Sequence, residues 1–208
     1  MAGVADHDRA MDIAIAYKPD EPRAFAMMPD MATTLLALAE VGRGNTGVTL
    51  DFCHMLSAGE LPARSAMLAP RHSRILGVQL NDRLGKRDDG LIAGSVHPVP
   101  TVEFFAALIR AGQDGVICFD TFPDHGGLNP GDGARETIRL TDLLRAIAAT
   151  LAADAAGADA QSRQDAAAAT RIVTRALYGQ AAGTANLPLV RYLRPYGPIP
   201  AGCSSILR

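Results

Sequence analysis

The chain has 208 residues, of which 48% are hydrophobic, and a formal net charge of −2 at pH 7. This length is ample for one folded domain and borderline for two. The near-neutral charge gives no electrostatic reason to expect nucleic acid or an acidic membrane surface as a partner. No uncharged apolar run is long enough to cross a bilayer, so a membrane partner is not expected either.

The cysteines predict a reducing, cytoplasmic setting. There are three of them, Cys53, Cys118 and Cys203, and no pair has C-x-x-C spacing. An odd number without a paired motif is atypical of a disulfide framework. The first ten residues carry several charges, which is unlike a secretory signal peptide.

Short apolar runs alternate with helical patterns along the chain. The runs predict strands near residues 12–17, 47–53, 75–80 and 115–120, with the second reaching Cys53. Because strands and helices alternate with short connections, we expect parallel strands joined by right-handed crossovers. The predicted helices are Met31–Val41 with Asp30 as N-cap, Leu61 to about Leu68 ended by Pro70, Thr101–Ala111, and Ala134 to about Ala152.

The C-terminal part has a different composition. Residues 153–169 are rich in alanine, aspartate and glutamine, and we expect a linker at Gly157 followed by a helix from about Gln161 to Leu177. The segment 181–208 contains four prolines and no clear hydrophobic period. We expect this tail to be irregular and loosely attached.

Polar residues stand at or just beyond the ends of the predicted strands. Asp51 and His54 lie at the end of the second strand, Lys18 just after the first and Asp120 at the end of the fourth. Carboxyl ends of parallel strands meet at one edge of a sheet, so these side chains should converge. A carboxylate and a neutral imidazole suit a divalent metal, although an isolated D-x-x-H is also common by chance. Asp88, in a charged loop, fits a ligand or a solvated charge equally well.

Four motifs in order resemble the second half of the xylose isomerase-like TIM barrels, which include xylose isomerase and L-rhamnose isomerase. They are YKPDEPR at 17–23, LDFCH at 50–54, LND at 80–82 with Asp88 beyond it, and FDTFP at 119–123. The resemblance covers roughly Met11 to Ala149. It implies a partial (β/α)8 barrel made of about four βα units, corresponding to strands 5–8 of the complete fold.

The resemblance implies an aldose–ketose isomerase with two divalent metals above the strand ends. Mn²⁺ is the expected ion, with Mg²⁺, Co²⁺ or Zn²⁺ as alternatives, and a small sugar is the expected partner. Matched by position, the residues divide into metal ligands, substrate contacts and catalytic groups. The metal ligands are Asp51, His54, Asp88, Asp120 and, weakly, Gln79; Lys18 and Asn81 contact the substrate; Lys18 and His54 are catalytic.

The chain departs from the family pattern at three ligand positions. Ala16 replaces a glutamate, Gln79 replaces a histidine or aspartate, and Gly90 replaces a loop aspartate. Because charge is the main attraction for a hard cation, we expect weak metal binding and impaired activity. The alternative is a non-catalytic remnant with a binding or structural role. An AP-endonuclease-like activity is less well supported. It would require a trinuclear zinc site rich in His and Glu and a basic DNA-binding face, and the sequence shows neither.

The number of strands predicts an incomplete barrel. Four βα units leave two open sheet edges, so we expect self-association or pairing with a missing N-terminal half-barrel. The expected organisation is a half-barrel over 1–152, a linker and C-terminal helix over 153–180, and an irregular tail over 181–208.

Overall fold

A computed structural model describes residues 1–20, 25–122 and 127–179 of the chain. Four expectations concern residues outside these ranges: the irregular tail 181–208, Cys203 within it, the part of the first motif beyond Asp20, and the part of the fourth motif beyond Phe122. No helix in the described ranges combines the length and apolar character that a membrane span requires.

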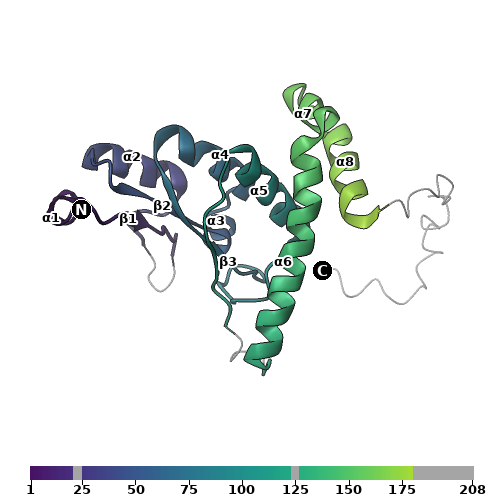
Figure 1. Ribbon diagram of the computed structural model, residues 1–208, viewed down its shortest axis with the longest axis horizontal. Coiled ribbons are helices and arrows are strands. Elements are labelled where there is room, and N and C mark those ends of the chain that lie inside the picture. Colours follow the sequence, from purple (N-terminus) through teal and green to yellow (C-terminus); the bar gives the residue numbers. More distant parts are fainter. Residues whose placement is uncertain (21–24, 123–126, 180–208) are drawn as a thin grey trace, which may run out of the picture.

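The described residues form a four-stranded parallel sheet in the order β1-β2-β3-β4 (Figure 1). This confirms the predicted α/β fold and is consistent with a partial TIM barrel. Each strand pairs with the next along the chain, and the register shifts once, between Val48 and Thr49. The strands are β1 Ile13–Ile15, β2 Thr46–Asp51, β3 Ile75–Leu80 and β4 Ile117–Phe119.

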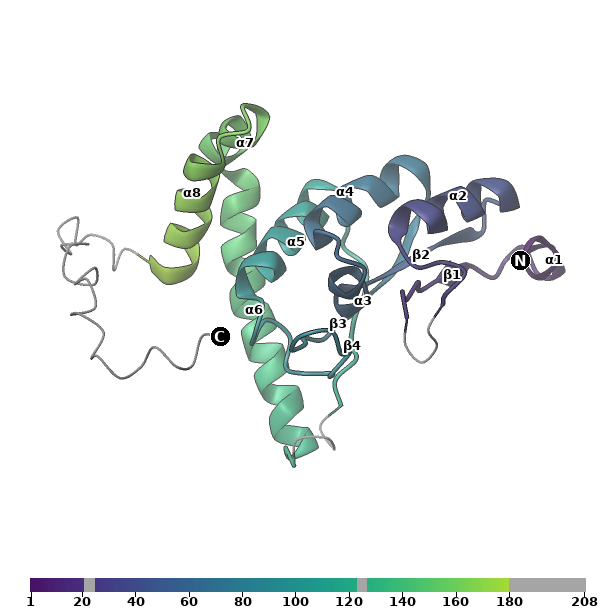
Figure 2. The same ribbon diagram turned by 180° about the vertical axis from the view of Figure 1, so that it is seen from behind.

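Helices α2, α4 and α5 lie together on one side of the sheet, and the long helix α6 runs past its β4 end (Figures 1 and 2). The parallel strands therefore have helices on one face, as in the wall of a barrel. The helices are α1 Ala2–His7, α2 Met31–Val41, α3 Phe52–Ser57, α4 Pro62–His72, α5 Pro98–Arg110, α6 Pro130–Ala153, α7 Ala155–Ser162 and α8 Ala166–Tyr178.

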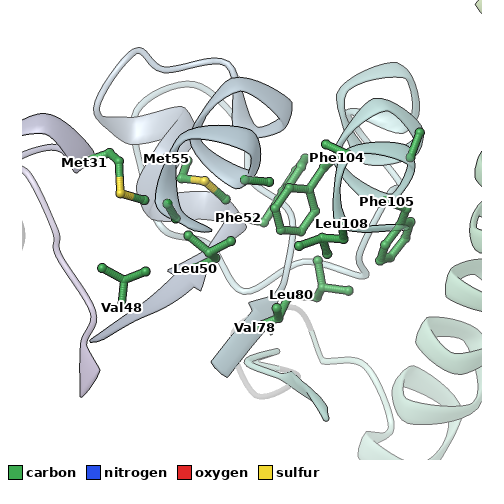
Figure 3. Close-up of a cluster of buried hydrophobic side chains, with 14 of the residues drawn as sticks. Met31, Val48, Leu50, Phe52, Met55, Val78, Leu80, Phe104, Phe105 and Leu108 are labelled. Atoms are coloured by element: carbon green, nitrogen blue, oxygen red, sulfur yellow. The ribbon is translucent and has the colours of Figure 1, made fainter. Parts of the chain in front are cut away.

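The hydrophobic core lies between the sheet and these helices (Figure 3). Full burial of one such side chain stabilises the fold by about 1.5–3 kcal/mol. Phe52 and Phe104 pack with ring centroids 5.6 Å apart, which ties the start of α3 to α5. The sheet contributes Val48, Leu50, Val78 and Leu80, and the helices contribute Met31, Phe52, Met55, Phe104, Phe105 and Leu108.

The second strand ends earlier than the sequence predicted. It stops at Asp51, and residues Phe52 to Ser57 form α3. The cause is local, because Asp51 Oδ1 accepts a hydrogen bond of 2.9 Å from the His54 backbone N–H and so caps the new helix. His54 therefore lies in the first turn of a helix and not in a loop.

Prolines open three of the helices, and Pro70, which was predicted to end a helix, lies inside one. Helix α4 starts at Pro62 and continues through Pro70 to His72, so the predicted stop at Pro70 was wrong. Pro98 and Pro130 occupy the first turns of α5 and α6, which therefore begin before Thr101 and Ala134. A first-turn proline is favourable because its missing N–H has no partner in the helix at that position.

The linker predicted at Gly157 is instead part of helix α7, which Asp154 caps through the Ala156 N–H. Helix α8 then begins at Ala166 rather than near Gln161. Apolar residues of α8, among them Ile172 and Val173, pack against the main core. Through these contacts the C-terminal helix is attached to the same body as the sheet.

Candidate active site

Asp51 ends β2 at the carboxyl edge of the sheet and is 1% exposed. One of its carboxylate oxygens caps α3, while Oδ2 has no hydrogen-bond partner among the described residues. Burial raises the pKa of Asp51, and the charges of Asp88 and Asp120 raise it further, against an opposing effect of His54. The fold thus holds a carboxylate whose charge is poorly compensated.

His54 stands one helical turn after Asp51 and points between two carboxylates. Its Nε2 atom lies 3.4 Å from Asp88 Oδ2 and 3.8 Å from Asp51 Oδ2. Its other ring nitrogen, Nδ1, is buried and has no hydrogen-bond partner in the described part of the chain. The spacing of the two residues along the chain therefore does bring an imidazole beside a carboxylate.

Asp88 reaches this cluster from the loop after β3. Its carboxylate accepts hydrogen bonds from Lys18 Nζ and Asn81 Nδ2, each at 2.8 Å, and its side chain is 4% exposed. Burial alone would raise the pKa of Asp88, but the contacts with His54 and Lys18 outweigh that effect and lower it strongly. Of the two interpretations left open for this residue, the solvated loop charge does not describe its buried position.

The structure brings the remaining predicted residues to the same edge of the sheet. Register pairs Gln79 directly with Asp51 and with Cys118, so all three lie in one row across the strands. Asp120 follows β4, where its backbone N–H donates to the Leu80 carbonyl at 3.0 Å. Its negative charge is close enough to contribute to the raised pKa of Asp51. The roles assigned to these residues stay predictions, but their convergence is an observed feature.

A second polar group beside this cluster was not identified from the sequence. Asp82 is fully buried and accepts hydrogen bonds from the backbone N–H groups of Arg83, Val96 and His97. Its Oδ1 atom also lies 2.6 Å from His97 Nδ1. These bonds fasten the two ends of the loop that carries Asp88. The motif LND was a signal for Asp82, but nothing in the sequence links it to His97, fifteen residues away.

Glu60 is the other polar residue that sequence reasoning missed. Its carboxylate accepts hydrogen bonds from the Tyr17 hydroxyl, from Ser65 Oγ at 2.9 Å and from the Met31 N–H at 2.8 Å. Burial, together with this carboxylate, raises the pKa of Tyr17 well above its ordinary value. Since Tyr17 directly precedes Lys18, these bonds fix the backbone from which Lys18 extends.

A cavity of about 420 Å³ lies between the loop after β3 and the first turns of α6. Its walls are mainly apolar, with Leu91, Phe122 and Leu128 among them. Asp89 and Thr121, the chain neighbours of Asp88 and Asp120, also line it. The cavity is large enough for a small organic molecule and is lined in part by the loop that carries Asp88.

The donor atoms at the cluster have the chemistry that a divalent ion prefers, but they are not arranged as a finished metal site. In the described ranges, no group of three or more His, Cys, Asp or Glu side chains has the geometry to hold a metal. Asp51 Oδ2 and Asn81 Oδ1 are nevertheless buried oxygens without partners. Oxygen atoms of this kind are the ligands that a hard cation prefers.

Comparison with known proteins gives a family match and structural neighbours. The family model described as xylose isomerase-like TIM barrel matches residues 1–146. A D-tagatose 3-epimerase-like protein superposes with a TM-score of 0.54 at 18% identity, over 73% of this chain and 51% of that protein. A xylose isomerase domain protein from Alicyclobacillus acidocaldarius subsp. acidocaldarius has a TM-score of 0.50 at 25% identity, over 67% and 52%. No curated protein matches the chain. The chain thus spans about half the length of these two solved structures.

Proposed function

Because the chain belongs to the xylose isomerase-like TIM-barrel family, we propose that it carries a sugar isomerase or epimerase site with a weakly bound divalent metal. The observation that supports this most is the cluster formed by Lys18, Asp51, His54, Asn81 and Asp88 at the carboxyl ends of parallel strands. That edge of a parallel sheet is where such folds bind their ligands.

Lys18 and Asn81 are the residues best placed to hold a sugar. The Lys18 ammonium bonds Asp88 at 2.8 Å and its side chain is 26% exposed, so a substrate can reach it. Asn81 is fully buried, donates to Asp88 and keeps Oδ1 as an acceptor. One cationic donor and one fixed amide acceptor can orient neighbouring hydroxyl and carbonyl oxygens of a small polyol.

His54 and Asp51 are the groups suited to proton chemistry and to holding a cation. Isomerisation moves a hydrogen between a carbonyl carbon and the adjacent hydroxyl-bearing carbon, and epimerisation removes a hydrogen from one carbon and returns it on the opposite face. An imidazole within 4 Å of two carboxylates is placed to accept a proton and to return it. When bound, a divalent ion would supply Lewis-acid polarisation of substrate oxygens, held by Asp51 and His54 with Asp88 and Asp120 nearby.

A non-catalytic binding role is the second candidate, and two observations favour it. Ala16 places no ligand on the sheet face where the family pattern has a glutamate, and Gln79 offers only a neutral amide beside Asp51. The Lys18 ammonium already neutralises part of the charge on Asp88. Both features weaken the attraction for a cation, and without a cation the cluster could bind a sugar and leave it unchanged.

Thermal unfolding in EDTA and in excess Mn²⁺, followed by a panel of aldoses and ketoses, tests the proposal. An ion at ten times its Kd stabilises the fold by about 1.4 kcal/mol, which is a measurable rise in Tm. Asp88→Asn should abolish most of that rise. Asp159→Asn is the matched control, because Asp159 pairs with Arg163 on the exposed surface of α7, outside the cluster.

If any sugar is converted to product, and the conversion requires both Mn²⁺ and Asp88, the enzymatic function is supported. Sugar binding without turnover would support the binding role. A Tm that neither Mn²⁺ nor any sugar changes, or that changes equally in both variants, would contradict both functions at this cluster.

A further inference from the structure

The face of the sheet opposite the helices is uncovered in the described chain. Strand residues alternate between the two faces, and Val48, Leu50, Val78 and Leu80 point to the helices and are buried. The alternate positions Ala14, Ala16 and Cys118 are exposed, and Thr49 and Gln79 are half-buried. None of these five side chains is charged. Asp51, which the register pairs with Gln79, adds a charge at the carboxyl edge of this face. A parallel sheet normally has both faces covered, so this face lacks the layer that such sheets require.

The two edges of the sheet are unpaired as well. Within the described ranges, β1 pairs only with β2, and β4 pairs only with β3. Large apolar side chains are exposed next to both edges: Met11 before β1, and Val116 before β4 at 79% exposure. Phe25 and Met27, beyond the carboxyl end of β1, are each 91% exposed. Free edges flanked by apolar residues are typical of surfaces that pair with another chain.

We propose that two copies of the chain associate face to face into a closed eight-stranded barrel, with β1 of each copy beside β4 of the other. A two-fold axis along the strands keeps all strands pointing the same way, so both new contacts are parallel, like the existing ones. The two edge strands are also equal in length, at three residues each.

Closure explains why the partner is a second copy and why assembly stops at two. Four strands and four strands give the eight that close a barrel of this type. The two solved neighbours have chains about twice as long as the part that this protein matches, 51% and 52% being covered. A second copy would occupy the position of the part that is not matched. After closure no edge remains for a third copy.

The assembly would also complete the surroundings of the cluster. Since the strands stay parallel, the clusters of the two copies lie at the same end of the barrel, on opposite sides of its axis. The exposed side of Lys18 would then face a closed interior instead of open solvent. Exclusion of water strengthens the electrostatic contacts of such a site.

Light scattering coupled to size exclusion, over a hundredfold range of protein concentration, tests this proposal. The expected mass is twice the 21.8 kDa of one chain. Cys118→Arg puts a charge on the uncovered face at one edge and should reduce the mass to that of a monomer. Ala14→Arg does the same at the other edge, in case the first variant does not fold. Both positions are exposed in the single chain, so the fold itself should tolerate them.

Leu36→Arg is the matched control. Leu36 is 70% exposed on α2, on the helical side of the sheet, and the variant should remain a dimer. A monomer at all concentrations would overturn the proposal, as would open polymers of increasing mass, because these would mean that the edges pair without closing. A dimer that Leu36→Arg disrupts but the two sheet-face variants do not would place the contact on the helices and would equally overturn it.

Discussion

Asp51→Asn should raise the stability of the metal-free protein. In the presence of a bound metal the same substitution should raise the stability less, or lower it. Asp51 is 1% exposed, and its Oδ2 has no hydrogen-bond partner in the described chain. Asparagine keeps an oxygen to accept the bond from the His54 N–H, so the cap of α3 survives. The substitution removes only the charge, whose desolvation and repulsion by Asp88 and Asp120 raise the pKa of Asp51. Without a cation, that charge opposes folding.

The size of the gain follows from the burial of one uncompensated polar group, about 1–3 kcal/mol. Each kcal/mol moves the Tm by about 2–4 °C in a chain of this size. Thermal unfolding by circular dichroism in EDTA should therefore show a rise of about 2–12 °C. In excess Mn²⁺ the difference should shrink or reverse, because the ion stabilises only the carboxylate form.

The control for this substitution is Asp30→Asn. Asp30 caps α2 through the Thr33 N–H at 2.7 Å, and asparagine caps equally well there. That variant should leave the Tm unchanged in both buffers. A lower Tm for Asp51→Asn in EDTA, together with an unaltered response to Mn²⁺, would refute the reasoning. It would show that the Asp51 charge is compensated within the fold and has no part in binding a cation.

Three further results are expected. Lys18→Met should lower the free energy of unfolding by about 1–3 kcal/mol in urea titrations, because Asp88 loses its cationic partner. Glu103→Gln should raise the Tm at pH 7 and leave it unchanged at pH 3. Burial raises the pKa of Glu103, so the charged form destabilises the fold. That cost is present above the pKa of the unfolded chain and absent at pH 3, where the carboxyl is protonated in both states. Since Glu103 is partly exposed, we expect a gain below about 1 kcal/mol. The double variant Ala16→Glu, Gln79→His should bind Mn²⁺ more tightly than the original chain in a calorimetric titration. Affinity rises about tenfold for every ~1.4 kcal/mol of added binding free energy. Equal affinity of the two chains would show that the ligand positions are misassigned.

The strands and their order could be predicted because the signals for them are local. Apolar runs bounded by glycine, proline and charged residues mark all four strands, and their alternation with helices fixes parallel pairing. Helix boundaries were less accurate where a side chain or a proline has two possible roles. Asp51 could extend a strand or cap a helix, and only the hydrogen bond to the His54 N–H decides between them. Pro130 could close a loop or open a helix, and it opens α6.

The cluster was predictable in part for the same reason. Asp51 and His54 are close in sequence and follow a strand, so their proximity is a local property. The contact of Lys18 with Asp88 joins residues seventy positions apart and depends on how the loop after β3 folds back. Glu60 lies in a loop without a recognisable motif, and its three hydrogen bonds come from three separate segments. No pattern within one segment can indicate a contact of that kind.

The cluster residues differ in what they contribute to the fold, and this difference bears on the choice between enzyme and binding module. Asp88 accepts hydrogen bonds from Lys18 and Asn81, so a structural role alone can account for it. Ala16 and Gln79 lie on the uncovered sheet face, where a changed side chain costs the fold little. Asp51 is the exception, because its charge destabilises the chain and asparagine could supply the same cap. A group that opposes folding is typical of a site built for a ligand. The response of Asp51→Asn to Mn²⁺ therefore separates a working metal site from a remnant.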